Sequence, residues 1–230
     1  MNELELTGRA QTHVVEVDEP RCLLHREAVK PFLAMRAAAG AAGIDLVPVS
    51  SFRDFDAQLR IWNEKYRGER KLYDRDGRPL ERAGLSEAEL IEAILWWSAM
   101  PGASRHHWGT EIDVIDAHAL PAGQGAKLLP IEFGPAGPFA RLNEWLAGHM
   151  HQFGFFRPYH NNRGGVSPEP WHLSYGPVAV GALTQLTVAV LKRALEDREL
   201  EAKAIVLGKL GDIHRRYLAS VDSPPQSSLA

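Results

Sequence analysis

Residues 104–113, SRHHWGTEID, constrain this chain more than any other stretch, because they place paired histidines and two carboxylates on either side of a glycine. Gly109 permits a tight turn at little steric cost. A chain that turns there and continues as a strand over 110–115 can bring His106 and Asp113 to the same point. A catalytic zinc ion usually has three protein ligands and keeps its fourth position for water. The stretch therefore predicts two ligands of a metal site and requires a third from elsewhere.

The predicted strand leaves two questions open. Alternate side chains of a strand point to opposite faces, so Glu111 shares a face with Asp113. Glu111 then either forms a hydrogen bond behind the metal site or lies beyond its rim. His107 competes with His106 for the ligand position, although the turn at Gly109 favours His106. If His107 is not a ligand, we expect it to contact a substrate.

The third ligand is expected in residues 167–175, SPEPWHLSY, which contain Glu169 and His172. Hydrolysis at a metal ion also requires a carboxylate that takes a proton from water. We therefore expect His172 to be the ligand and Glu169 to be the general base. Pro170 restricts the backbone between them, which helps to hold both side chains in place.

Together the two motifs resemble those of the VanY-type D-alanyl-D-alanine carboxypeptidases. They read Ser104-x-His106-x-x-Gly109-x-x-x-Asp113 and Glu169-x-Trp171-His172. This resemblance implies Zn²⁺ as the cofactor. It assigns the zinc ligands to His106, Asp113 and His172, and the catalytic glutamate to Glu169. Motif matches of this kind are hypotheses that the structural context must support.

The resemblance continues upstream in residues 50–58, SSFRDFDAQ, where the family has an arginine that binds substrate. That residue is Arg53, and a guanidinium matches a terminal carboxylate with two parallel hydrogen bonds. We therefore count Arg53 as both catalytic and substrate-binding. Gln58 and Ser104 are the further substrate-binding candidates besides His107. The alternatives are a salt bridge at a helix start for Arg53 and a turn for Ser104.

Helices and strands are mixed without a regular alternation, which favours an α+β fold. The resemblance implies a small antiparallel sheet flanked by helices, as in the Hedgehog/DD-peptidase fold. We expect a zinc peptidase domain over 1–176, with its core at about 25–176. Helices over 177–220 form an extension packed on that domain, and 221–230 form a disordered tail.

The composition excludes several classes of partner. The 26 basic and 29 acidic residues give a net charge of −3, which offers no basic surface for nucleic acid. No stretch approaches the ~20 apolar residues of a membrane span. Cys22 is the single cysteine, so no intrachain disulfide can form. The first 19 residues lack an apolar signal segment, so we expect a cytoplasmic protein, or a periplasmic one if translation starts upstream.

The resemblance implies hydrolysis of D-alanyl-D-alanine-type or other cell-wall peptides, with a peptidoglycan stem peptide or another D-Ala-D-Ala-terminated peptide as the substrate. A carboxypeptidase is favoured, because Arg53 would bind the terminal carboxylate. An endopeptidase, a dipeptidase and a zinc-stabilised binding module without turnover remain alternatives. The family usually has alanine at the position of Glu111 and often has arginine near that of Ser174. These departures leave the exact peptide open, as the sequence does for the oligomeric state.

Overall fold

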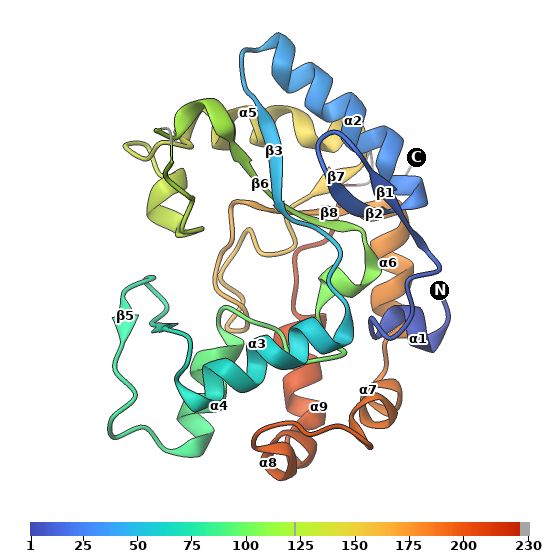
Figure 1. Cartoon of the computed structure of the whole chain (residues 1–230), viewed down its shortest axis with the longest axis vertical. Coiled ribbons are helices and arrows are strands. Elements are labelled where there is room, and N and C mark those ends of the chain that lie inside the picture. Colours follow the sequence, from blue (N-terminus) through green and yellow to red (C-terminus); the bar gives the residue numbers. More distant parts are fainter. Residues whose placement is uncertain (122, 226–230) are drawn as a thin grey trace.

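The computed structural model describes residues 1–121 and 123–225. Its centre is a four-stranded antiparallel sheet in the order β3-β6-β8-β7, with helices on either side (Figure 1). The strands are β3 (Leu46–Ser50), β6 (Glu111–Asp116), β8 (His172–Tyr175) and β7 (Phe155–Phe156). Mixed helices and a small antiparallel sheet confirm the predicted α+β class.

The central strand β6 is buried along its whole length. Ile112 and Val114 pack into a hydrophobic cluster on one face of the sheet, which leaves the other face to the carboxylates of the predicted site. The strand register pairs Asp113 with Ser50 on β3 and with His172 on β8. The sheet therefore places two predicted ligands from distant parts of the chain directly opposite each other.

The first hydrophobic cluster joins the sheet to two helices, α2 (Arg26–Ala41) and α5 (Ala140–His149), which lie at the same end of the molecule (Figure 1). An antiparallel hairpin, β1 (Val14–Val17) with β2 (Cys22–His25), leads into α2. Helix α2 begins at Arg26, directly after this hairpin. Pro31 lies inside α2 and marks neither of its ends.

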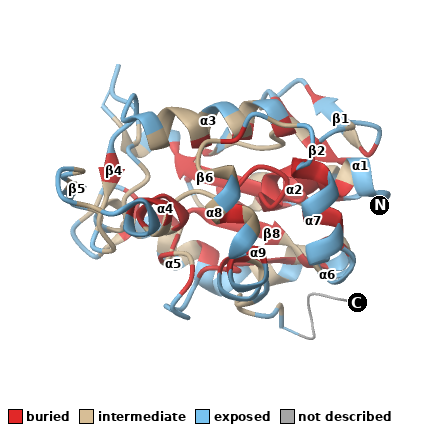
Figure 2. Ribbon diagram, turned by 90° about the horizontal axis from the view of Figure 1, so that it is seen from below, coloured by how far each residue is buried: buried red, intermediate tan, exposed pale blue. Residues whose placement is uncertain are grey.

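The second hydrophobic cluster lies between α3 (Phe55–Arg67), α4 (Glu87–Leu95) and the C-terminal helices. Asp54 caps the start of α3, and Gly68, with φ of 85°, ends the helix. Ser86 and Glu89 form a capping box at the start of α4. Figure 2 shows buried and exposed residues together on α4 and on the C-terminal helices α7 and α9, so that each of them has a buried side.

The C-terminal segment forms more helices than the apolar pattern predicts. They are α6 (Gly176–Gln185), α7 (Val188–Leu195), α8 (Lys203–Gly208), α9 (Leu210–Ile213) and a π-helical turn over His214–Ala219. Helices α6 and α7 are separate, because Thr187 caps a new helix by accepting a hydrogen bond from the Val190 N–H. No described helix alone is long and apolar enough to cross a membrane. The pair α6 and α7 passes that test by length and composition but is bent by 77°.

Short elements complete the described chain. They are α1 (Glu3–Leu6), β4 (Leu72–Tyr73), β5 (Pro79–Leu80) and the 3-10 turns Arg105–Trp108, Ala117–Ala119, Pro130–Phe133 and Met150–Phe153. The strands β4 and β5 pair as a small antiparallel hairpin. In the predicted disordered tail, Asp222 accepts hydrogen bonds from Asn161 and Arg163, so the chain is held to the domain there. Residues 226–230 of that tail lie outside the described residues.

Candidate metal centre

The turn that contains the paired histidines is closely packed. The 3-10 helix Arg105–Trp108 ends at Gly109, whose φ of 66° is the left-handed conformation that glycine adopts without strain. A Cβ atom at Gly109 would lie 2.4 Å from a methyl group of Val14 and 2.7 Å from the backbone nitrogen of His25. The predicted tight turn is therefore present, and the β1–β2 hairpin packs directly against it.

The imidazole of His106 is oriented by the backbone. Its Nδ1 lies 2.8 Å from the carbonyl oxygen of Ser51. A carbonyl oxygen only accepts hydrogen bonds, so Nδ1 carries the proton. The other nitrogen, Nε2, lies 3.3 Å from Oδ2 of Asp113. His106 thus presents an unprotonated nitrogen beside a carboxylate, which is the form in which histidine binds a metal ion.

His172 lies between two carboxylates on the neighbouring strand. Its Nδ1 is 2.9 Å from Oδ1 of Asp113, and its Nε2 is 2.8 Å from Oε2 of Glu111. Burial alone would lower the pKa of His172, but the hydrogen bonds to Asp113 and Glu111 outweigh it and raise the pKa to about 10. Of the two places considered for Glu111, the structure has it directly behind the site, bonded to His172.

Three side chains therefore meet at one point, because ligand atoms of His106, Asp113 and His172 all lie within 4.8 Å of one another. Tetrahedral ligands at about 2.0–2.1 Å from zinc lie about 3.3 Å apart. The measured separations of 3.3 Å and 2.9 Å between the imidazole nitrogens and the carboxylate of Asp113 are close to that value. Two nitrogens and one carboxylate oxygen fit a zinc site that keeps a position for water.

Glu169 lies at the edge of this triad. Its Oε2 is 3.6 Å from Nδ1 of His172, and the residue is buried. Burial raises the pKa of the Glu169 carboxyl to about 8, and attraction to His172 only partly opposes this. A carboxyl group whose pKa lies near neutral pH can accept and return a proton in one reaction cycle.

The triad and Glu169 line one cavity of about 370 Å³. Arg53 and Ser104 line it as well, so six of the eight predicted site residues share this space. The other lining residues, among them Lys65 on α3 and Trp97 after α4, come from the helical side of the molecule. The cavity is thus built from the sheet and from the helices together.

The match of the chain to a known protein family agrees with this geometry. The model of the VanY family, described as D-alanyl-D-alanine carboxypeptidase, matches residues 21–178, well over half of the chain.

The chain belongs to the VanY D-alanyl-D-alanine carboxypeptidase family.

Several relatives of this VanY-family chain show how far the similarity extends. An uncharacterized protein of Haemophilus influenzae is 37% identical over 118 residues, which cover 50% of this chain and 90% of that relative. A D-alanyl-D-alanine carboxypeptidase of Enterococcus faecalis is 28% identical over 162 residues, which cover 69% of this chain and 50% of that protein. The chain thus matches half of the length of that carboxypeptidase.

Two solved structures have the same fold as the VanY-family chain. One is VanYB in complex with D-Alanine-D-Alanine, with a TM-score of 0.52, 20% identity, and coverage of 84% of this chain and 87% of that one. The other is a VanY mutant from a VanB-type resistance cassette in complex with Zn(II), with a TM-score of 0.51, 21% identity, and coverage of 83% and 88%. They confirm the predicted fold class.

Arg53 of this VanY-family chain lines the cavity and is held there by two hydrogen bonds. Its two terminal nitrogens donate to Oε1 of Gln58 at 2.8 Å and to Oγ of Ser50 at 2.9 Å. The Gln58 amide also donates to the carbonyl of Ala99 at 2.6 Å. Gln58 is fully buried and does not line the cavity. Gln58 therefore positions Arg53 in this structure. It was predicted to contact the substrate instead.

His107 also differs from its predicted role. Its side chain is 0% exposed and does not line the cavity. Nδ1 donates to the carbonyl of Arg53 at 2.6 Å, and Nε2 accepts from the N–H of Gly102 at 3.1 Å. Both ring nitrogens are thus used inside the protein. His107 holds the backbone of Arg53 in place, and the expected contact with substrate is wrong for this structure.

Sequence reasoning missed four charged residues at the cavity, namely Lys65, Arg70, Arg105 and Lys127. Arg105 lies in the motif itself, but nothing in the local pattern shows that its side chain turns inward to Glu111 at 3.2 Å. Lys65 could have been found, because it lies seven residues after Gln58. Residues seven apart lie on the same face of a helix.

Proposed function

We propose that this protein is a zinc-dependent carboxypeptidase that removes the terminal D-alanine from D-Ala-D-Ala-terminated stem peptides of the cell wall. The observation that carries the proposal is the convergence of His106, Asp113 and His172 with Glu169 on one cavity. Membership of the VanY family supports it. So do related structures that contain Zn(II) or D-Alanine-D-Alanine.

In this proposal the metal is held by Nε2 of His106, Nδ1 of His172 and a carboxylate oxygen of Asp113. Bound zinc would supply a Lewis acid that lowers the pKa of water to about 7 and polarises a carbonyl group. The chain itself keeps the ligands in the required tautomers through Ser51 and Glu111. Such contacts behind the ligands commonly decide how tightly a metal is bound.

Glu169 acts as the general base in this proposal. It takes a proton from the attacking water and passes it to the amine that leaves, so that one carboxylate serves both halves of the reaction. Its position 3.6 Å from His172 supports this role. Its burial keeps bulk water away from the transferred proton.

Arg53 binds the terminal carboxylate of the peptide and so determines which peptide bond lies beside Glu169. Its hydrogen bonds to Gln58 and Ser50 hold the guanidinium in one orientation before the substrate arrives, which reduces the entropy lost on binding. Ser104 also lines the cavity and is the second candidate for a substrate hydrogen bond. A fixed anchor for the chain end favours a carboxypeptidase over an endopeptidase.

The test is Glu169→Gln, assayed on muropeptides of defined stem length with the products identified by mass. We expect kcat to fall by about 10²–10⁴-fold, with one zinc per chain retained. Glu144→Gln, an exposed position on α5, is the matched control and should keep wild-type turnover. The wild-type protein should release a single D-alanine, and removing zinc with a chelator should abolish turnover until zinc is added back.

Different failures separate the alternatives. Near-normal hydrolysis by Glu169→Gln would exclude Glu169 as the base. Internal cleavage by the wild-type protein would indicate an endopeptidase, and a released dipeptide would indicate a dipeptidase. One zinc per chain without hydrolysis of any such peptide would indicate a binding module.

A further inference from the structure

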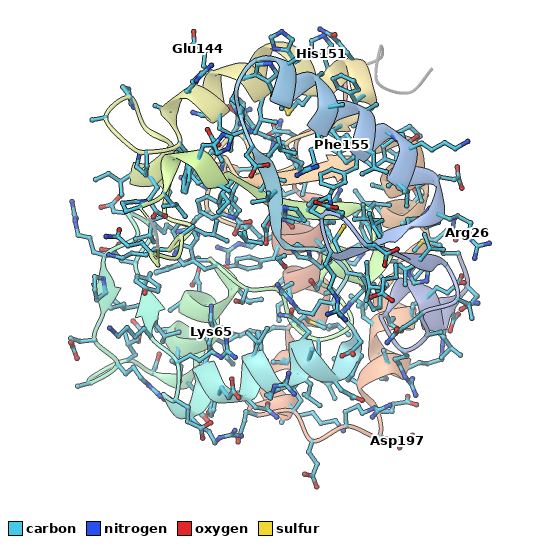
Figure 3. All side chains as sticks on the ribbon, turned by 45° about the horizontal axis from the view of Figure 1, so that its top comes forward. Arg26, Lys65, Glu144, His151, Phe155 and Asp197 are labelled. Atoms are coloured by element: carbon cyan, nitrogen blue, oxygen red, sulfur yellow. The ribbon has the colours of Figure 1, made fainter. Side chains whose placement is uncertain are left out.

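Lys65 lies at the candidate active site but belongs to none of the motifs that define it. It is in the last turn of α3, on the side of the helix that faces the interior (Figure 3). It lines the same cavity as the metal-ligand triad and Glu169. Its Nζ donates a hydrogen bond of 2.6 Å to Oγ of Ser98, which lines the cavity beside it.

The ammonium group of Lys65 has no carboxylate partner. Among the described residues no acidic group lies within 4.0 Å of it. Two other cations of the cavity are compensated, because Arg70 pairs with Glu64 and Arg105 pairs with Glu111. Burial lowers the pKa of Lys65 to about 8, against the attraction of Glu169. A cation that is shielded from water and has only a neutral partner gains more free energy from binding an anion than an exposed cation does.

The place of Lys65 relative to Arg53 limits what this anion can be. Gln58 holds Arg53 through a hydrogen bond. Lys65 follows Gln58 by seven residues on the same face of α3, so the two residues are about 10 Å apart along the helix. An extended peptide covers that distance in about three residues. A ligand whose terminal carboxylate lies at Arg53 would therefore reach Lys65 with a group about three residues before its C-terminus.

We infer that Lys65 determines specificity by binding a second carboxylate of the substrate, so that the preferred substrate is an acidic peptide. This inference rests on the proposed function and specifies its substrate class. Lys127, which is exposed and also lines the cavity, adds positive charge around the same place. The added charge draws acidic peptides towards the cavity before they bind.

The experiment compares two peptides that both end in D-Ala-D-Ala. They differ only in carrying a free side-chain carboxylate or its carboxamide three residues before the C-terminus. For the wild-type protein we expect kcat/KM to be about tenfold higher for the acidic peptide. A charge-assisted hydrogen bond provides a difference of this size. In Lys65→Met this ratio should fall to about one. High salt should reduce the wild-type ratio, because it screens the charge interaction.

Two further variants keep the test decisive. Lys65→Gln can still bond to Ser98, so it loses the charge with less risk to folding, and its ratio should also fall to about one. Lys192→Met, at an exposed position of α7, is the matched control and should keep the wild-type ratio. A wild-type ratio near one, or a tenfold ratio that survives in Lys65→Gln, would overturn the role of Lys65. Absence of hydrolysis of both peptides would instead reject the proposed function.

Discussion

The two candidate histidine ligands are oriented by groups that are not ligands. His106 donates from Nδ1 to the Ser51 carbonyl, and His172 contacts Glu111 through Nε2. In each ring only one nitrogen then faces Asp113. Glu111 itself is fixed by hydrogen bonds from Ser174 at 2.6 Å and Thr110 at 3.0 Å. A carboxylate behind a histidine ligand raises the basicity of the imidazole and strengthens metal binding.

Glu111→Gln tests this arrangement at the residue scale. The amide oxygen can still accept from His172, but the negative charge is lost. We expect zinc affinity, measured by competition with a chromophoric chelator, to fall by about 10–100-fold. Glu144→Gln removes a charge of the same kind from an exposed position of α5 and should leave the affinity unchanged. Equal affinities for the wild type and Glu111→Gln would show that Glu111 does not support the ligand.

Among the elements, the turn before β6 decides where His106 lies. Gly109 combines a left-handed backbone with a close approach of the β1–β2 hairpin. The N–H of His25 at the end of that hairpin donates to the carbonyl of Gly109 at 2.7 Å. No side chain larger than hydrogen can be placed at Gly109 without moving the hairpin or the turn.

Gly109→Ala should therefore destabilise the protein. A strained backbone conformation and the overlap with Val14 and His25 together should lower the free energy of unfolding by about 3 kcal/mol or more. Urea unfolding followed by circular dichroism measures this. Gly148→Ala, in α5 with open space at the added methyl group, is the control and should stabilise the protein by about 0.5–1 kcal/mol. Similar effects of both substitutions would mean that the turn tolerates a side chain.

At the scale of the whole molecule, the C-terminal helices belong to the body of the protein. Leu191 and Leu195 on α7 are fully buried in one cluster with Trp62 of α3. The Trp62 indole also donates to the carbonyl of Glu201 at 3.2 Å. Because α3 carries Arg53's partner Gln58 and also Lys65, the C-terminal helices support the wall of the candidate active site.

Leu191→Ala tests this coupling. Removing a side chain that is 0% exposed should lower the free energy of unfolding by about 2–5 kcal/mol. Tryptophan fluorescence and circular dichroism should report the same urea midpoint, since one cooperative unit unfolds. Val188→Ala, on the same helix but 38% exposed, should change stability by less than about 1 kcal/mol. Two separate transitions would show that the C-terminal helices unfold independently.

Much of the fold and of the candidate site follows from local sequence patterns. Helix α3 could be predicted because its apolar positions, its cap at Asp54 and its end at Gly68 all lie within one stretch. The break between α6 and α7 was missed, because both helices are apolar and a capping threonine at 187 looks like an ordinary helical residue. The hairpin of β4 and β5 was missed because each strand has only two residues.

The sequence by itself determined which residues each motif brings together, because each motif is short and its geometry is local, whereas the register of β6 with β8 brings the two motifs to one place. A glycine turn followed by a strand brings His106 near Asp113, and a proline fixes Glu169 beside His172. Only the tertiary structure decided what surrounds them. The contact of Glu111 with His172 joins residues 61 apart, and that of Lys65 with Ser98 joins residues 33 apart. Such contacts depend on strand register and helix packing, which a local pattern does not specify.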